Sequence, residues 1–277
     1  MRSAPARQSG FRGGRKGKGL LRRFKVRIHA VDSTVIQLVA NCMDWAKHRR
    51  RKAAAKMHLR LDLHSFLPSF AIVDTAGQHD NMRAREVCAT ILPGEIVVFD
   101  KTYVDFDHLF DLDQRGVWWV TRAKDNMKFR VVKHHTKGNE NIIKDQIIAL
   151  QGKHKGMKLR RVEAWVEVDG EWRVMVFITN NTEWSPRSVC DLYRRRWDIE
   201  VFFKQVKQSL KLGSFLGHSA NAVRWQVYAI KALTCIAGNW DVKQIRDIAD
   251  CTKIPVSYLA KVLKNRAPQR VLAAPFR

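Results

Sequence analysis

Two acidic residues stand where carboxylates could bind metal ions. Asp32 follows an alternating apolar segment that predicts a strand ending at Asp32, and Asp100 follows a continuous apolar run at residues 96–99 that is typical of a buried central strand. Sites in open α/β sheets form at the carboxyl ends of strands, so adjacent strands would bring both acids within reach of shared ions. Carboxylate oxygens with water and phosphate favour Mg²⁺ or Mn²⁺. Two such ions can stabilise the attacking and leaving oxygens of a phosphoryl displacement.

A third acid, Glu200, falls within a predicted long helix. Ser185 and Pro186 suit its N-cap and first position, and the pattern runs to about residue 212. At about 100° per residue, one narrow face holds Tyr193, Arg196, Glu200 and Lys207, with Lys204 and Lys211 close beside them. The adjacent apolar stripe comprises Leu192, Ile199, Phe203, Val206 and Leu210. This helix could pack on a sheet and lean Glu200 towards the strand ends. Taken alone, the periodicity favours an ordinary amphipathic helix with a solvated charged face.

Strand and helix patterns elsewhere predict the scaffold for these acids. The predicted strands are residues 25–32, 56–63, 66–73, 95–100 and 117–121, and the predicted helices are 81–91 and 104–114. This order predicts an α/β fold, a mixed sheet flanked by helices. Residues 126–184 are strand-rich, with segments 159–168 and 172–179 joined by a turn at Asp169-Gly170. They predict a β-rich insertion before the last helix.

The charge of the chain indicates a polyanionic partner. Its 277 residues include 51 Lys and Arg against 26 Asp and Glu, a net charge of +25. Nucleic acid is the first candidate and an anionic membrane surface the second. No apolar run is long enough to span a membrane, and no apolar segment follows the basic N-terminus as in a secretory signal. Five scattered cysteines without a CxxC pair argue against a disulfide framework or a zinc site, and for a reducing cytoplasm.

The face of the long helix also carries a family resemblance. Tyr193, Arg196, Glu200 and Lys207 match all four positions of the Y-x2-R-x3-E-x6-K signature of insertion-sequence-4-type transposases. Further similar blocks are Asp32-Ser33-Thr34, Trp45-Ala46-Lys47 with Arg50, Lys56-x-His58, Gln78-His79-Asp80, Asp100 with Tyr103-Val104-Asp105-Phe106, Thr121-Arg122-Ala123-Lys124 and residues 215–222. The resemblance spans about residues 20–228. It implies an RNase H-like fold with a β insertion, and a catalytic triad of Asp32, Asp100 and Glu200 that holds two Mg²⁺ or Mn²⁺ ions.

The function implied by this resemblance is that of a bacterial DDE transposase. Such an enzyme cleaves a DNA strand with water and then joins a 3′-hydroxyl to target DNA. Its partners would be transposon ends and target DNA. A homodimer on DNA is compatible with this function. The expected setting is the bacterial cytoplasm, in association with DNA. Phosphate contacts are expected from Tyr193, Arg196, Lys207, Lys204, Lys211 and the run Arg49, Arg50 and Arg51. Solvated surface charge is the simpler alternative for these basic residues.

Five segments make up the expected domain organisation. They are a basic disordered tail (1–24), the first part of the catalytic core (25–125), the β insertion (126–184), the core's signature helix (185–224) and a helical segment (225–277). The last segment reads as a helix-turn-helix and resembles the start of an iron–sulfur-type winged-helix repressor. Two surface helices native to a transposase are the alternative.

Two features depart from the resembled family. Its members usually place Gly or Ala where Thr102 stands, and they carry an N-terminal domain that recognises transposon ends, whereas this sequence has a basic tail. A truncated copy would explain this, so the alternative function is a catalytically inactive DNA-binding remnant or regulator. A stand-alone RNase H-like nuclease is a third reading, against which the signature helix argues. Structural roles are favoured for His79 and Asp80, and packing over base stacking for Trp165 and Trp172.

Overall fold

We describe the protein from a computed structural model. The structure describes residues 23–38, 47–48, 52–75, 80–135, 141–168 and 170–209. The chain divides into two compact units. Unit 1 comprises residues 1–33, 58–72 and 78–201, and unit 2 comprises residues 34–57, 73–77 and 202–277.

The elements follow the chain in a mixed α/β order. They are β1 (Ile28–Leu38), β2 (Lys47–His48), β3 (Lys52–Asp62), β4 (Leu67–Thr75), α3 (Asp80–Cys88), β5 (Ile96–Phe99), the short 3₁₀ helix η2 (Lys101–Tyr103), α4 (Phe106–Gln114), β6 (Trp118–Arg122), β7 (Phe129–His134), β8 (Ile142–Leu150), β9 (Lys158–Val168), β10 (Glu171–Thr179), α5 (Pro186–Arg194) and α6 (Trp197–Ser209). Four of them, β1, β3, β4 and α6, begin in one unit and end in the other. Within the described ranges, no helix is long and apolar enough to cross a membrane.

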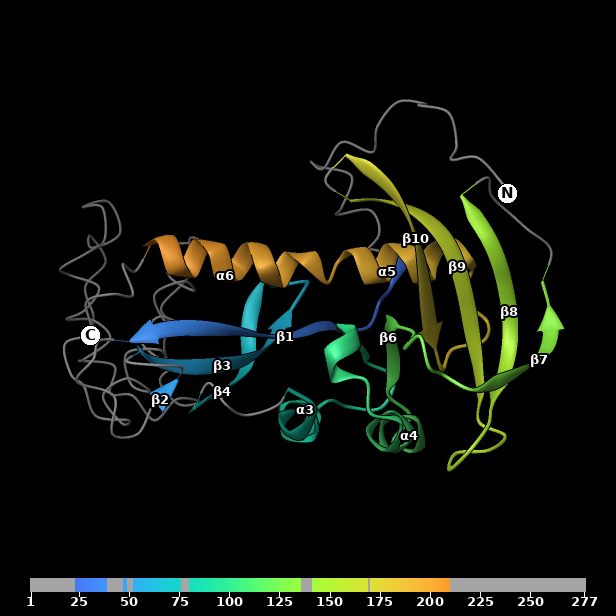
Figure 1. The fold of residues 1–277 in the computed structure, drawn as a ribbon, viewed down its shortest axis with the longest axis horizontal. Coiled ribbons are helices and arrows are strands. Elements are labelled where there is room, and N and C mark those ends of the chain that lie inside the picture. Colours follow the sequence, from blue (N-terminus) through green and yellow to red (C-terminus); the bar gives the residue numbers. More distant parts are fainter. Residues whose placement is uncertain are drawn as a thin grey trace. The chain divides into compact units, whose positions relative to one another are not determined.

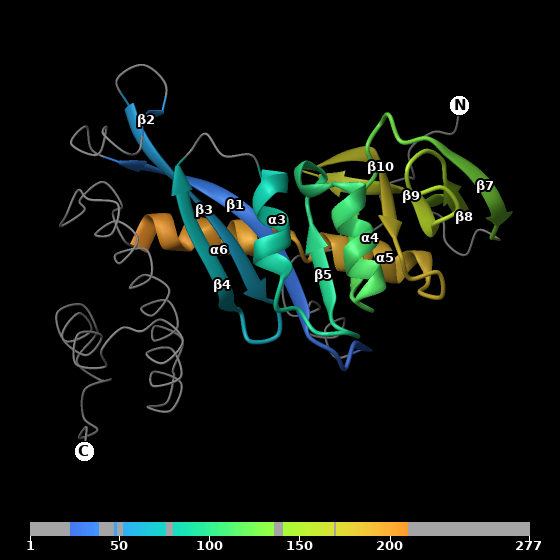
Figure 2. The same ribbon diagram turned by 90° about the horizontal axis from the view of Figure 1, so that it is seen from below.

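Unit 1 is built on a mixed sheet. Its strand order is β3-β1-β5-β6-β10-β9-β8-β7, with β4 paired to β3. The β1, β5 and β6 strands are parallel, whereas β10, β9, β8 and β7 run antiparallel to their neighbours. Helices α3 and α4 lie on one face and α5 on the other (Figures 1 and 2). The expectation of a mixed sheet flanked by helices is therefore confirmed.

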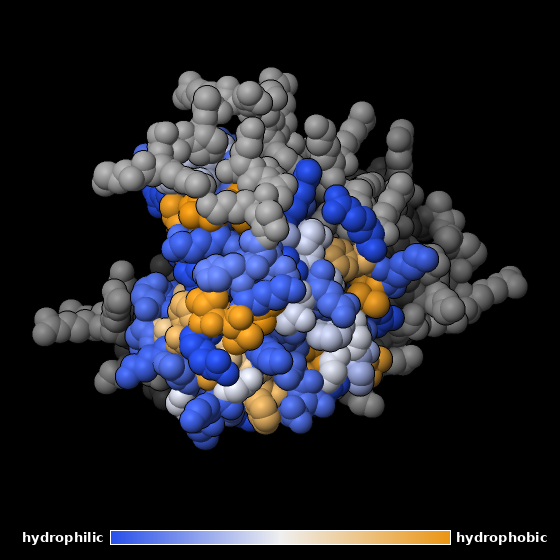
Figure 3. Space-filling view, turned by 90° about the vertical axis from the view of Figure 1, so that its right-hand side faces the viewer, coloured by the Kyte–Doolittle hydropathy of each residue, from blue (hydrophilic) through white to orange (hydrophobic). Residues whose placement is uncertain are grey.

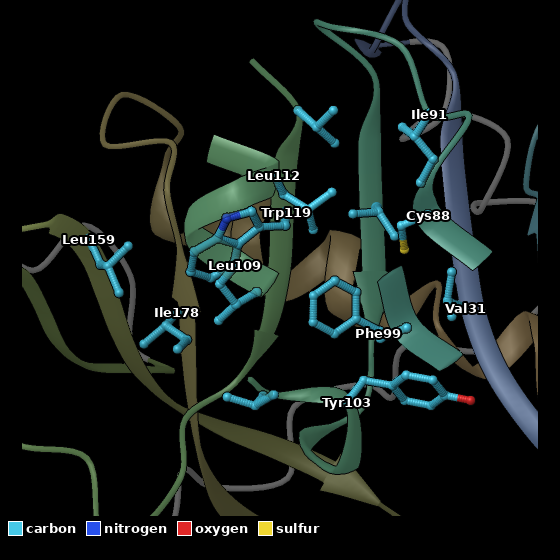
Figure 4. Packing of buried hydrophobic residues seen from close by; sticks show 14 of the residues in the cluster. Val31, Cys88, Ile91, Phe99, Tyr103, Leu109, Leu112, Trp119, Leu159 and Ile178 are labelled. Atoms are coloured by element: carbon cyan, nitrogen blue, oxygen red, sulfur yellow. The ribbon is translucent and has the colours of Figure 1, made fainter. Parts of the chain in front are cut away.

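The hydrophobic core of unit 1 fills the space under α3 and α4. Phe99 of β5 lies in the middle of the cluster, between Trp119 of β6 and Val31 of β1 (Figure 4). Leu109 of α4 and the ring of Trp119 are fully buried. Because the interior is close-packed, this cluster fixes β1 and β5 where their pairing ends, next to the two predicted aspartates.

Unit 2 contains parts of β1, β3, β4 and α6, and also β2, a strand that the sequence did not predict. Strand β2 pairs antiparallel with β3, with Lys47 opposite Ala53 and His48 opposite Lys52. A two-residue strand carries no detectable alternation, which is why the pattern did not reveal it.

Strand β1 corrects one boundary of the sequence prediction. The strand was expected to end at Asp32, but it continues to Leu38. Its parallel pairing with β5 ends one residue earlier, at Val31 opposite Phe99. The prediction was wrong about the strand's end because Asp32 interrupts the apolar alternation, which resumes with the buried Ile36.

The long signature helix is also corrected, because it is two helices. Helix α5 begins as predicted, with the Ser185 hydroxyl accepting from the Ser188 amide at 3.1 Å and Pro186 in the first turn. It ends at Arg194, and α6 begins at Trp197. Between them the Arg196 amide donates to the Tyr193 carbonyl and the Asp198 amide to the Arg195 carbonyl, at 3.0 and 3.1 Å. These i to i+3 bonds tighten the chain locally, and no Gly or Pro marks the position.

Strands β7 to β10 form an antiparallel meander in the segment predicted to be a β insertion. Its β9–β10 hairpin turns at Gly170, whose φ of 82° favours glycine. Figure 3 faces the end of the molecule that bears β7 and shows apolar patches within a hydrophilic surface. The half-exposed apolar side chains of these strands include Val131, Val132 and Val174. The predicted strand pair 159–168 and 172–179 is confirmed.

Candidate active site

The register of two parallel strands places Asp32 and Asp100 side by side. Pairing of β1 with β5 runs from Ile28 opposite Ile96 to Val31 opposite Phe99. Asp32 and Asp100 directly follow this last pair in the sequence. Asp100 therefore stands at the carboxyl end of β5, where sites in such folds form, and Asp32 lies within β1 at the point where its pairing with β5 stops. The Asp32 Oδ1 atom accepts a 2.8 Å hydrogen bond from the Ser33 amide.

A compact turn follows Asp100 and fixes its backbone. Asp100 is the N-cap of η2, and its carbonyl accepts from the Tyr103 amide at 3.0 Å. The buried Tyr103 hydroxyl lies 3.4 Å from Nδ1 of the equally buried His58. Asp105 caps α4 by accepting from the amides of Asp107 and His108. The polar residues of this sequence block thus anchor the turn, and two blocks that resemble the family, at His58 and Tyr103, meet in space.

Helix α5 and the turn after it reach both aspartates. The Tyr193 hydroxyl donates to Asp100 Oδ1 at 3.0 Å. Arg196 donates from Nη1 to Asp32 Oδ2 at 3.3 Å, and its Nη2 lies 2.6 Å from Glu200 Oε1. Tyr193 and Arg196 therefore link Asp32, Asp100 and Glu200, which are up to 168 positions apart in sequence, into one network.

The two linking side chains are buried. Tyr193 is 3% exposed and Arg196 is 7% exposed, whereas the Glu200 side chain is 44% exposed. The guanidinium carbon of Arg196 lies 5.6 Å from the ring centre of Tyr193 and 5.5 Å from that of Trp197, which are cation–π distances. From the sequence, Tyr193 and Arg196 were predicted to contact DNA phosphates. Their contacts with Asp32, Asp100 and Glu200 were not predicted. The shared helix face with Glu200 was the signal that could have found them.

Burial and like charge shape the electrostatics of the site. Burial raises the pKa of Asp32 to about 6, the Ser33 amide and Arg196 oppose this shift, and the charges of Asp100 and Glu200 add to it. Burial also raises the pKa of Tyr193, and the Asp100 carboxylate adds to the shift. Asp32 therefore carries its charge at a cost that a nearby cation would relieve.

The donor set suits a hard divalent cation. Three carboxylates supply the oxygen ligands that Mg²⁺ and Mn²⁺ prefer, and the charges of Asp100 and Glu200 both reach Asp32. Among the described residues, no group of three or more His, Cys, Asp or Glu side chains is gathered closely enough to hold a metal ion outright.

The other predicted site residues lie elsewhere or outside the described ranges. Lys204 and Lys207 are exposed on α6. Trp165 and Trp172 are half-buried on the β9–β10 hairpin. The residues whose surroundings are not described are Lys211, Arg49, Arg50, Arg51 and His79, together with residues 1–22 and the whole segment 225–277.

Comparison with known families identifies the class of protein. Residues 24–236 match the family described as "Transposase DDE domain". The match covers most of the chain and includes Asp32, Asp100 and Glu200. The chain belongs to the DDE transposase family, whose members carry out phosphoryl transfer.

Individual relatives are named as transposases. The protein y4zB of Sinorhizobium fredii, which is named as a transposase, is 31% identical to this chain over 223 residues. The match covers 78% of this chain and 59% of the length of y4zB. The probable transposase of IS5377 from Geobacillus stearothermophilus is 23% identical, over 89% of this chain and 65% of its own length. The chain thus spans about three fifths of the length of these relatives. A piggyBac transposase synaptic complex with hairpin DNA aligns over 88% of this chain and 55% of its own, with 10% identity and a TM-score of 0.46.

Proposed function

We propose that this protein is an insertion-sequence transposase that cleaves and joins DNA strands with Asp32, Asp100 and Glu200 as metal ligands. The observation that carries the proposal is the network in which Tyr193 contacts Asp100 while Arg196 contacts Asp32 and Glu200. It links acids from β1, from the residue after β5 and from α6 at the place where the pairing of β1 with β5 ends, the arrangement expected of an RNase H-like core with β7 to β10 as its insertion.

The residues of the site divide the work between metal binding and positioning. Bound Mg²⁺ or Mn²⁺ would activate the attacking water or hydroxyl and stabilise charge on the leaving oxygen. Asp32 and Asp100, fixed where the packed strands β1 and β5 stop pairing, would provide rigid ligands. The half-exposed Glu200 would provide the third ligand from the side that faces solvent.

DNA is the proposed substrate because of the charge of the protein. A net charge of +25 favours a polyanion. Lys204 and Lys207 are exposed on α6, two turns or fewer beyond Glu200 in sequence, and are proposed to contact phosphates. The proposed partners are the transposon ends and the target DNA.

A metal-binding experiment tests the triad. Mn²⁺ should raise the melting temperature of the full chain, because a ligand that binds only the folded state stabilises it by mass action. Asp100→Ala should lose this effect. The matched control is Asp125→Ala, which removes a 92% exposed aspartate and should keep it. An equal response to Mn²⁺ in all three proteins would rule out the triad as the metal site.

A cleavage experiment tests the enzyme. Supercoiled plasmid incubated with the protein and Mn²⁺ should be nicked, and Glu200→Gln should abolish nicking because it removes a charged ligand with little change of shape. Glu171→Gln, at a 71% exposed position of β10, is the control that should remain active. DNA binding without nicking by the unaltered protein would favour the alternative of a non-catalytic DNA-binding protein.

A further inference from the structure

Arg196 is held in place from several sides by the active site itself. Its two terminal nitrogens contact acids from different elements, Asp32 on β1 and Glu200 on α6. Its planar head lies against the rings of Tyr193 and Trp197. With 8% of its side chain exposed, it is among the most buried cations of the described residues. This placement differs from that of a side chain that reaches outward to bind phosphate.

The positive charge of Arg196 offsets the repulsion among the carboxylates of the site. The negative charges of Asp100 and Glu200 make the charge of Asp32 less favourable, and the burial of Asp32 adds to this cost. Arg196 supplies one positive charge between two of them. Its fork geometry lets a single side chain bridge two carboxylates, which a lysine ammonium on a flexible stem does less well.

From this geometry we propose that Arg196 is the built-in counter-ion of the acidic triad. It keeps Asp32 and Glu200 together before metal arrives and opposes the metal electrostatically when it binds. Arg196 is therefore a positioning residue, and the proposal rests on the proposed function. Arg196 and a divalent ion do the same electrostatic work, so each should matter more when the other is absent.

The consequence is a negative coupling between Arg196 and metal ions. Removing the arginine charge should lower the melting temperature without metal, because the acids are then uncompensated. The same change should increase the stabilisation that Mn²⁺ provides and tighten its apparent binding on the order of tenfold, because a like charge next to the ion is gone. A role limited to phosphate contact predicts weaker DNA binding and an unchanged response to Mn²⁺.

The test compares four proteins of 277 residues by thermal unfolding and calorimetric titration with Mn²⁺ alone, in the absence of DNA. They are the unaltered protein, Arg196→Met, Arg196→Lys and the control Arg187→Met. Arg187 is on α5, has a 56% exposed side chain and pairs with Asp191 at 3.8 Å, so its loss removes the same charge away from the triad. We expect the Mn²⁺-induced rise in melting temperature to be at least twice as large in Arg196→Met as in the unaltered protein. Arg196→Lys should be intermediate and Arg187→Met unchanged.

Each other outcome overturns the inference. If Arg196→Met binds Mn²⁺ as the unaltered protein does, or more weakly, Arg196 is not a counter-ion that competes with metal. If Arg196→Met does not fold, Arg196→Lys decides, because it must still bind Mn²⁺ more tightly than the unaltered protein. If neither the unaltered protein nor any variant responds to Mn²⁺, the proposed metal chemistry fails and the inference fails with it. An Mn²⁺ response that is lost in Asp100→Ala but equal with and without Arg196 refutes the inference alone.

Discussion

The buried ion pair between Arg160 and Asp145 should be a major determinant of the stability of the β7–β10 meander. The side chains are 7% and 2% exposed. Arg160 on β9 donates to both carboxylate oxygens of Asp145 on β8, at 2.8 and 2.6 Å, and its third donor reaches the Thr182 carbonyl at 2.9 Å. Arg160→Met would leave the Asp145 carboxylate buried without a counter-charge.

The expected cost follows from this burial. Removing one partner of a buried ion pair costs about 3–5 kcal/mol, whereas replacing both with apolar residues of similar volume is often near neutral. We therefore expect Arg160→Met to lower the free energy of unfolding by about 3–5 kcal/mol. The double variant Arg160→Met/Asp145→Leu should lie within about 2 kcal/mol of the unaltered protein, which corresponds to a coupling energy of several kcal/mol between the two sites.

Urea unfolding followed by circular dichroism measures these differences. The control is Arg173→Met, which breaks the exposed pair with Glu171, whose side chains are 60% and 71% exposed at a 2.9 Å separation. That variant should cost no more than about 1 kcal/mol. A loss below about 1 kcal/mol in Arg160→Met, or a double variant no more stable than Arg160→Met, would refute the reasoning.

Three further predictions concern buried groups and charge. Burial, followed by the nearby Arg85, lowers the pKa of His108 from 6.5 to about 4, so the unfolded state binds a proton in this range that the native state does not. The free energy of unfolding should fall by up to about 3 kcal/mol as the pH drops from 6.5 to 4, and pH-dependent urea unfolding of His108→Phe should show a flatter profile across it. Asn180→Leu should cost about 2–4 kcal/mol in the same measurement, because Asn180 accepts from the Trp119 amide at 2.9 Å and donates to the Val117 carbonyl at 3.0 Å; a cost below about 0.5 kcal/mol would contradict this. DNA affinity, measured by fluorescence anisotropy between about 50 and 200 mM salt, should fall steeply on a log–log plot, and a flat plot would exclude phosphate contacts as its main source.

The strands and the acids could be predicted from the sequence because their signals are local. The apolar run before Asp100 and the alternation before Asp32 each record a strand that buries one or both faces. Ser185 and Pro186 identify the start of α5 because capping depends on neighbouring residues alone. The third acid, Glu200, was identified by a family signature, whose spacing from Tyr193 and Arg196 also lies within one short segment.

Only the tertiary structure decided how these parts act together. The pairing of Val31 with Phe99 brings Asp32 beside Asp100, and a strand's own sequence does not state its partner's register. No Gly or Pro marks the helix break at Arg195 and Arg196, where the Arg196 side chain contacts Asp32 of the distant strand β1. Arg196 reads as surface charge on a helical wheel, yet it is buried between Asp32 and Glu200. Burial and ion pairing depend on residues that are distant in sequence. The sequence therefore identifies the three acidic residues, whereas only the fold shows that Arg196 neutralises part of their charge.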